Sequence, residues 1–160
     1  MFRKMRRTRQ ELPKEECERI LFENKTGVLG VIGDGGYPYT VPLNYVYEDG
    51  KIYFHCAKTG HKLDAIRNDP KVSFCVIDKD EVVKEELTTY FRSVIAFGRA
   101  REITDENELC QAAEKLGLKY SDDIEFIRRE ISCDKNVLCC IEITVEHLSG
   151  KQSKELINNI

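Results

Sequence analysis

The sequence predicts a mainly β protein with flanking helices, in which most strands form an antiparallel barrel. Apolar residues alternate in consecutive runs joined by tight turns, and the single short crossover, about ten residues long, is marginal for a parallel βαβ unit. The length of 160 residues suits one domain with a single core. We therefore expect one domain over residues 1–160, in which residues 1–10 form a basic N-terminal arm.

The first half of the chain predicts one helix and then three strands. Apolar residues after Pro13 recur at helical spacing. Asp49 and Gly50 tolerate the positive φ of a type I′ turn and predict a hairpin. Pro42, inside a strand pattern, marks an edge or a bulge because it lacks a backbone donor. The strands are expected at residues 26–33, 37–48 and 51–57, with a glycine-rich turn at 33–36.

The second half predicts three more strands and three more helices. The charged segment 78–86 is too polar for a core and predicts an exposed loop. The strands are expected at residues 71–77, at residues 87–103, which are long enough for one bent strand or two, and at residues 137–145. Each helix is expected after a capping residue. The expected helices are residues 60–69 after Thr59, residues 105–118 after Thr104, and residues 122–131 after Ser121.

Charge is distributed unevenly along the chain. Five basic residues give residues 1–10 a charge of +5, which leaves −8 for the rest of a chain whose net charge is −3. An acidic body opposes binding to a phosphate backbone, so we expect no nucleic-acid partner and an arm that is solvated or packed on a partner chain. No apolar run is long enough for a membrane span, and the N-terminus lacks a signal-peptide core. The expected location is the cytoplasm.

The cysteine pattern argues against a metal site. The sequence has seven cysteines and three histidines, without a C-x-x-C pair. Structural zinc requires closely paired thiolates and imidazoles, so no metal is expected. Most of the cysteines stand inside apolar runs, which predicts reduced and mostly buried thiols.

Two basic side chains stand at the start of the helix expected at 60–69. His61 and Lys62 fall in its first turn, where free backbone amides and the positive end of the helix dipole already favour an anion. A cation is disfavoured at that position unless something negative compensates it. A phosphate ester is one such anion; the alternative is that both side chains point into water.

Three separated blocks of sequence carry a family resemblance. They are VPLNYVYEDGKIYFHCAKTGHKLDAIRNDPKVSF, YFRSVIAFGRA and EHLSGKQS, in this order along the chain. Together they resemble the FMN-binding split-barrel family, in particular its nitroimidazole-resistance branch related to pyridoxamine 5′-phosphate oxidase. The resemblance covers about Arg3 to Gln152 and implies a six-stranded split β-barrel. It also implies a homodimer with FMN in a groove between the two subunits.

The resemblance implies eleven cofactor-binding residues. The isoalloxazine ring would be lined by Val41, Pro42, Leu43 and Asn44, and the ribityl chain and ring would have beside them His55, Cys56 and Ala57. The phosphate would be held by His61 and Lys62, and the partner subunit would contribute Ser93 and Val94.

The implied activity is that of an FMN-dependent oxidoreductase. Hydride or electrons would pass from reduced FMN to a small acceptor such as a nitroimidazole or another nitroaromatic, and no catalytic side chain is required. The alternative is a non-catalytic dimer that binds flavin, haem or deazaflavin as a sensor or store. True pyridoxamine phosphate oxidases carry basic residues where this chain has Thr40 and Tyr45, so that oxidase activity is not expected.

Three residues of the set have simpler alternatives. His55 alternates with Phe54 on a strand, so the alternative for it is an ordinary half-buried histidine. Cys56 has no partner base in the sequence, which favours packing over a nucleophilic role. Asn44 would hydrogen-bond a polar edge of the flavin or cap the bulge at Pro42.

Overall fold

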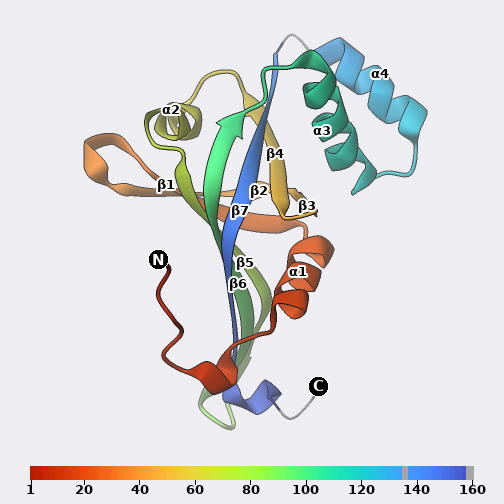
Figure 1. Cartoon of the computed structure of the whole chain (residues 1–160). Coiled ribbons are helices and arrows are strands. Elements are labelled where there is room, and N and C mark those ends of the chain that lie inside the picture. The colour runs from red at the N-terminus through yellow and green to blue at the C-terminus, as the bar shows by residue number, and fades with distance from the viewer. Residues whose placement is uncertain (135–136, 158–160) are drawn as a thin grey trace.

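Seven strands and four helices make up the computed structural model, which describes residues 1–134 and 137–157 (Figure 1). The strands are β1 (Thr26–Ile32), β2 (Pro38–Asn44), β3 (Val46–Glu48), β4 (Lys51–Ala57), β5 (Lys71–Val83), β6 (Thr88–Glu102) and β7 (Leu138–Gln152). The helices are α1 (Lys14–Glu23), α2 (His61–Asn68), α3 (Glu106–Leu118) and α4 (Ile124–Asp134). Short 3₁₀ turns occur at η1 (Thr8–Gln10), η2 (Asp34–Gly36) and η3 (Lys154–Leu156).

All strand pairs are antiparallel, in the order β2-β1-β5-β6-β7-β4-β3. The first and last strands of this order are joined in the chain by Tyr45 alone. The sheet must therefore curl until its two edges meet at Tyr45, which confirms the mainly β barrel class. The strand expected at 37–48 divides at this residue, so the described residues hold seven strands where the resemblance implied six.

Tyr45 is held firmly at this meeting point. Its side chain is fully buried, and its hydroxyl donates a hydrogen bond of 2.7 Å to the carbonyl of Leu21. Its ring lies edge-on to Phe74, with 4.9 Å between the ring centroids. Asp49 and Gly50, a few residues later, have φ of 48° and 77°. Both values lie in the left-handed region, so the predicted hairpin turn is confirmed.

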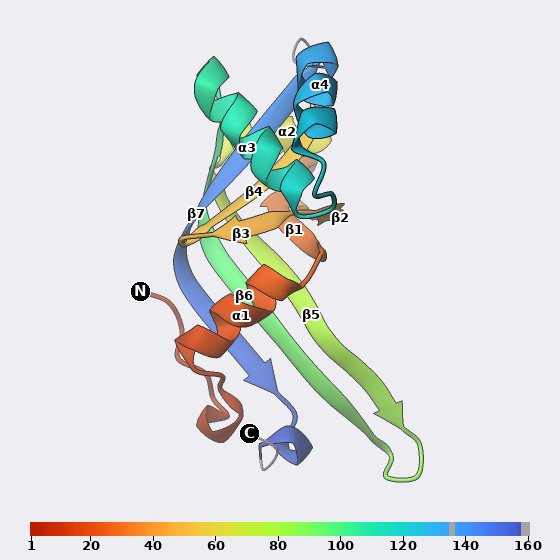
Figure 2. The ribbon, with the colours of Figure 1, turned by 90° about the vertical axis from the view of Figure 1, so that its right-hand side faces the viewer.

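The loop expected at 78–86 is wrong. β5 continues to Val83 and β6 begins at Thr88, so most of the charged segment is strand. A register shift between Ile77 and Lys79 lets the ladder between these strands resume after a bulge. Figure 2 shows this hairpin extending away from helices α2, α3 and α4. Similarly, β7 continues past residue 145, the end that the sequence predicted, to Gln152.

All three helix caps differ from the prediction. Asp123 precedes α4 in place of Ser121, and its carboxylate accepts a 2.9 Å hydrogen bond from the backbone N–H of Phe126. Gly60, with φ of 137°, precedes α2 in place of Thr59, because that backbone conformation favours glycine. Asp105 caps α3 in place of Thr104, and its carboxylate accepts a 2.9 Å hydrogen bond from the backbone N–H of Glu108.

The core lies inside the barrel and is closed by α1 and α2. α2 contributes Leu63, Ala65 and Ile66 to this core. A second, smaller cluster beside β4 and β7 holds α3. The N-terminal arm is anchored on its own chain, since the Phe2 ring stacks on His147 with 4.6 Å between centroids. Among the described residues, no helix is long and apolar enough to cross a membrane.

Candidate functional site

The barrel is open between two strand edges. β3 covers β4 only at Lys51, Ile52 and Tyr53, so the rest of β4 is free on that side. The outer edge of β2 is likewise unpaired, and no ladder joins β2 to β4 in the part of the chain that the structure describes. We call this opening the split. Backbone amides and carbonyls along both edges are available to a ligand.

The start of α2 closes one end of the split. His61 Nε2 accepts a hydrogen bond of 3.3 Å from the backbone N–H of Asp34. The His61 ring also stacks on Tyr39 of β2, with 4.2 Å between centroids. These contacts tie the first turn of α2 to β2 and to the turn that precedes it. Because Nε2 acts as the acceptor, the neutral imidazole carries its proton on Nδ1.

Lys62 is the second residue of α2 and makes the helix start cationic. No carboxylate pairs with it among the described residues, whereas Arg67 on the same helix pairs with Glu102 at 2.8 Å. Burial raises the pKa of the Cys56 thiol on β4, and the positive charge of Lys62 opposes this rise. The lysine therefore lies within electrostatic reach of the β4 edge. Free N–H groups of the first helical turn add to the positive potential.

The strand residues of the predicted site divide between two faces. Pro42, Asn44, His55 and Ala57 are exposed, whereas Val41, Leu43 and Cys56 are partly buried against the core. The backbone N–H and C=O groups of Val41 and Leu43 address β1, so these two residues offer a ligand in the split no backbone hydrogen bond. His55 lies on the exposed part of β4.

Asn44 has a structural role at the end of β2. Its amide nitrogen donates to the carbonyl of Lys25 at 3.1 Å and to the hydroxyl of Thr26 at 3.2 Å. Its amide oxygen remains an acceptor for a ligand.

An apolar pocket adjoins Asn44 and His55. It has a volume of about 340 Å³ and is closed on the other side by residues of α3, α4 and the segment between them, including Leu116, Tyr120 and Phe126. The sequence did not assign these residues to the site. The sequence predicted both helices, but an apolar period within a helix does not show which strand the helix covers.

Ser93 and Val94 lie on β6, away from both edges of the split. Ser93 is partly exposed. Val94 as a whole residue is fully buried in its own chain, so its predicted contact with a flavin bound to the neighbouring subunit is wrong for this conformation. The structure therefore brings nine of the predicted residues to the split and its closed end, and places these two elsewhere.

The seven cysteines are all free thiols. Three are buried, three are partly buried and Cys133 is exposed. Burial raises the pKa of Cys17 to about 11 and those of Cys139 and Cys140 to about 12. Within the described residues, no three histidine, cysteine or carboxylate side chains lie close enough together to hold a metal ion.

We expect one fast thiol per folded chain and seven after unfolding. Thiol reagents attack the thiolate, so buried groups with a raised pKa react slowly. Titration with a chromogenic disulfide reagent measures the count. Cys133→Ser should abolish the fast phase and Cys110→Ser should leave it intact; several fast thiols in the folded protein would contradict the burial of the others.

An antiparallel barrel that is open between two strand edges, with a cationic helix start at one end of the opening, has the split-barrel fold. The chain belongs to the pyridoxamine 5′-phosphate oxidase family, whose model matches residues 13–152. This confirms the resemblance noted in the sequence. No curated protein sequence matches the chain.

Solved structures share the fold. A candidate 5-nitroimidazole antibiotic resistance protein from Bacteroides thetaiotaomicron is 21% identical, with a TM-score of 0.72 over 89% of this chain and 86% of its own. An FAD-binding protein from Mesorhizobium loti is 26% identical, with a TM-score of 0.63 over 91% and 98%. An FAD and heme binding protein from Mycobacterium smegmatis is 16% identical, with a TM-score of 0.68 over 91% and 74%.

Proposed function

We propose that the chain binds FMN along the split and acts as an FMN-dependent oxidoreductase on a small acceptor such as a nitroimidazole. The observation that carries this proposal is the unpaired Lys62 at the start of α2, at the closed end of an opening between two free strand edges. The likeness to proteins described as FAD-binding and as a candidate nitroimidazole resistance protein supports it.

The residues present fit the parts of FMN. A phosphate dianion suits the first-turn amides of α2 and the ammonium of Lys62. The planar ring system suits the exposed side chains of Pro42 and Ala57, and its polar edge can donate to the free amide oxygen of Asn44. His61 is already tied to Asp34 and Tyr39, so it would position the helix start and present Nδ1–H to the phosphate.

When bound, FMN would supply the redox chemistry, and the protein would supply binding and orientation. Under this proposal the apolar pocket beside Asn44 and His55 receives the acceptor. Its volume of about 340 Å³ suits a single-ring molecule, and its lining side chains Leu116 and Phe126 keep water from the reacting ring. A homodimer would complete the groove with Ser93 from the second subunit.

The protein reconstituted with FMN is expected to consume NADH or NADPH when a 5-nitroimidazole is present. Absorbance of the flavin and of the reduced nicotinamide is followed without oxygen, and the acceptor is then added. FMN binding without turnover of either donor would favour the alternative, a flavin-binding dimer that serves as sensor or store. Failure to bind FMN, or preferential binding of haem or deazaflavin, would contradict the proposal.

A further inference from the structure

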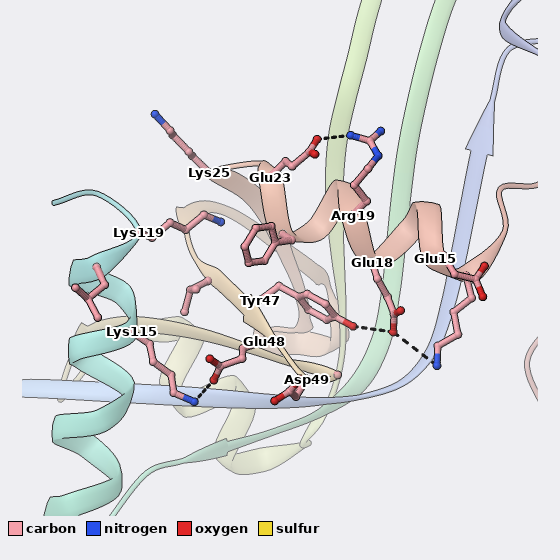
Figure 3. A pocket seen from close by; sticks show the side chains of 15 residues that line it. Glu15, Glu18, Arg19, Glu23, Lys25, Tyr47, Glu48, Asp49, Lys115 and Lys119 are labelled. Carbon is pink, nitrogen blue, oxygen red and sulfur yellow. Dashed lines mark hydrogen bonds and ion pairs between the residues drawn. The ribbon is translucent and has the colours of Figure 1, made fainter. Parts of the chain in front are cut away.

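A large cavity lies on a different part of the molecule from the split. It has a volume of about 1010 Å³ and is lined by α1, by the β3–β4 hairpin and by the C-terminal half of α3 (Figure 3). None of the eleven residues predicted for the cofactor contributes to its lining. The proposed function therefore leaves this cavity without a role.

The cavity contains apolar surface that no other part of the described chain covers. Phe22 is 68% exposed and Leu118 is 46% exposed, and both line the cavity together with Val46. Large apolar side chains that are exposed on one concave surface are typical of a ligand site. An apolar molecule would make van der Waals contacts with these side chains and would remove their apolar surface from water.

Most charges around the cavity are already paired. Lys14 pairs with Glu18 at 3.6 Å, Arg19 pairs with Glu23, and Lys115 pairs with Glu48. Lys25 and Lys119 have no carboxylate partner among the described residues. Figure 3 shows Lys119 reaching into the cavity from the α3 side.

Lys119 is half-buried, and its ammonium is only partly satisfied. It donates to the carbonyl of Asn24, and its nitrogen lies 4.3 Å from the centroid of the Tyr45 ring. An ammonium has three N–H donors, so one remains for a ligand. Burial and the nearby charge of Lys25 together lower the pKa of Lys119 to about 8, which indicates that its positive charge lacks compensation.

The two lysines also make the electrostatic potential differ between the two ends of the cavity. They stand at the C-terminal end of α1, where the helix dipole supplies about half a negative charge against their two positive charges. A net positive charge therefore remains at this end. Glu15, which has no partner among the described residues, lies in the first turn at the opposite end of the same helix. The potential favours an anionic group beside Lys119 and disfavours one beside Glu15.

We propose that this cavity binds a small organic acid with an apolar body. Its carboxylate takes the free donor of Lys119 and lies near Lys25, and its apolar body packs on Phe22, Val46 and Leu118. The site is separate from the split and does not depend on flavin binding.

The test compares 4-fluorobenzoate with its neutral analogue 4-fluorobenzyl alcohol by ¹⁹F NMR titration of the full chain. A charge-assisted hydrogen bond predicts that the benzoate binds about tenfold more tightly than the alcohol. Lys119→Met should remove this preference, and Lys119→Arg should retain it. Lys115→Met is the matched control: it is one turn earlier on α3, lines the same cavity and is already ion-paired, so its effect should be small.

The dependence on pH supplies a second readout. Below pH 8 Lys119 is cationic, so the benzoate should keep its roughly tenfold advantage over the alcohol there and lose that advantage as the pH rises through the pKa of about 8. Binding of the alcohol should not change over this range. Phe22→Ser, at an exposed position, should weaken both probes without affecting folding.

Three outcomes would overturn the proposal. They are equal or undetectable binding of the two probes to the wild type, an equal loss in the Lys115→Met and Lys119→Met variants, and displacement of the benzoate by excess FMN. The last would place the probe in the split. If FMN fails to bind at all while the benzoate still responds to Lys119, the proposed flavin function fails and this inference stands.

Discussion

Lys62→Ala is expected to lower the affinity for FMN by about tenfold or more, because under the proposed function it removes a charge-assisted contact that would contribute about 1.5–3 kcal/mol. The ammonium has no carboxylate partner among the described residues, so the substitution frees no buried anion that would disturb the fold. Quenching of FMN fluorescence on titration with protein gives the dissociation constants. Lys71→Ala is the control: Lys71 is exposed at the start of β5, on the far side of β1 from β2, and its effect should be negligible.

A comparison of FMN with riboflavin measures how much the phosphate group contributes to the affinity. Wild-type protein should prefer FMN over riboflavin by at least about tenfold, since riboflavin lacks the group that Lys62 and the α2 amides would bind. In Lys62→Ala this preference should shrink while the affinity for riboflavin stays the same. Equal losses for both ligands would show that Lys62 supports the structure of the site and does not contact the phosphate.

Dimerisation should tighten when FMN is present. A ligand that touches both subunits binds the dimer better than the monomers, so by linkage the dimer must be stabilised by the ligand. With free FMN at about 100 times its dissociation constant, each occupied site contributes about 2.7 kcal/mol, and two sites contribute about twice that. Sedimentation at graded protein concentrations, with and without FMN, measures the shift in the dimer constant.

Ser93→Trp tests the shared groove directly. Ser93 lies on β6, away from the split of its own chain, so loss of FMN affinity in this variant would indicate contact across the interface. Thr144→Trp, at an exposed position on the neighbouring strand β7, is the matched control and should leave FMN affinity unchanged. A monomer that retains stoichiometric FMN would exclude a groove built from two chains.

Features that depend on neighbouring residues were predicted well from the sequence. The turn at Asp49 and Gly50 requires only two residues that tolerate positive φ, and α1 requires only a helical apolar period after Pro13. For the candidate site, the sequence could predict that His55 and the pair His61 and Lys62 border one opening, because β4 and α2 are consecutive elements with a short connection.

Features that depend on a distant partner were missed. The alternation of Tyr39, Val41, Leu43, Tyr45 and Tyr47 runs unbroken through two strands, and periodicity cannot show that the hydrogen-bonding partner changes from β1 to β4. The charged segment 78–86 has no apolar period of its own and forms a strand because β6 pairs with it. The pocket formed with α3 and α4 depends on packing between residues far apart in the chain.

The two prolines of β2 bear on the risk of aggregation. An unpaired strand edge is a template on which another chain can add a strand. Backbone donors alternate between the two edges of a strand, so Pro38, Thr40, Pro42 and Asn44 address the same edge. Because β2 keeps its whole ladder with β1, that edge is the outer one. Two of its four positions, Pro38 and Pro42, have no backbone N–H to donate. An added strand would lack half of those hydrogen bonds, so the opening resists polymerisation while it stays accessible to a small molecule.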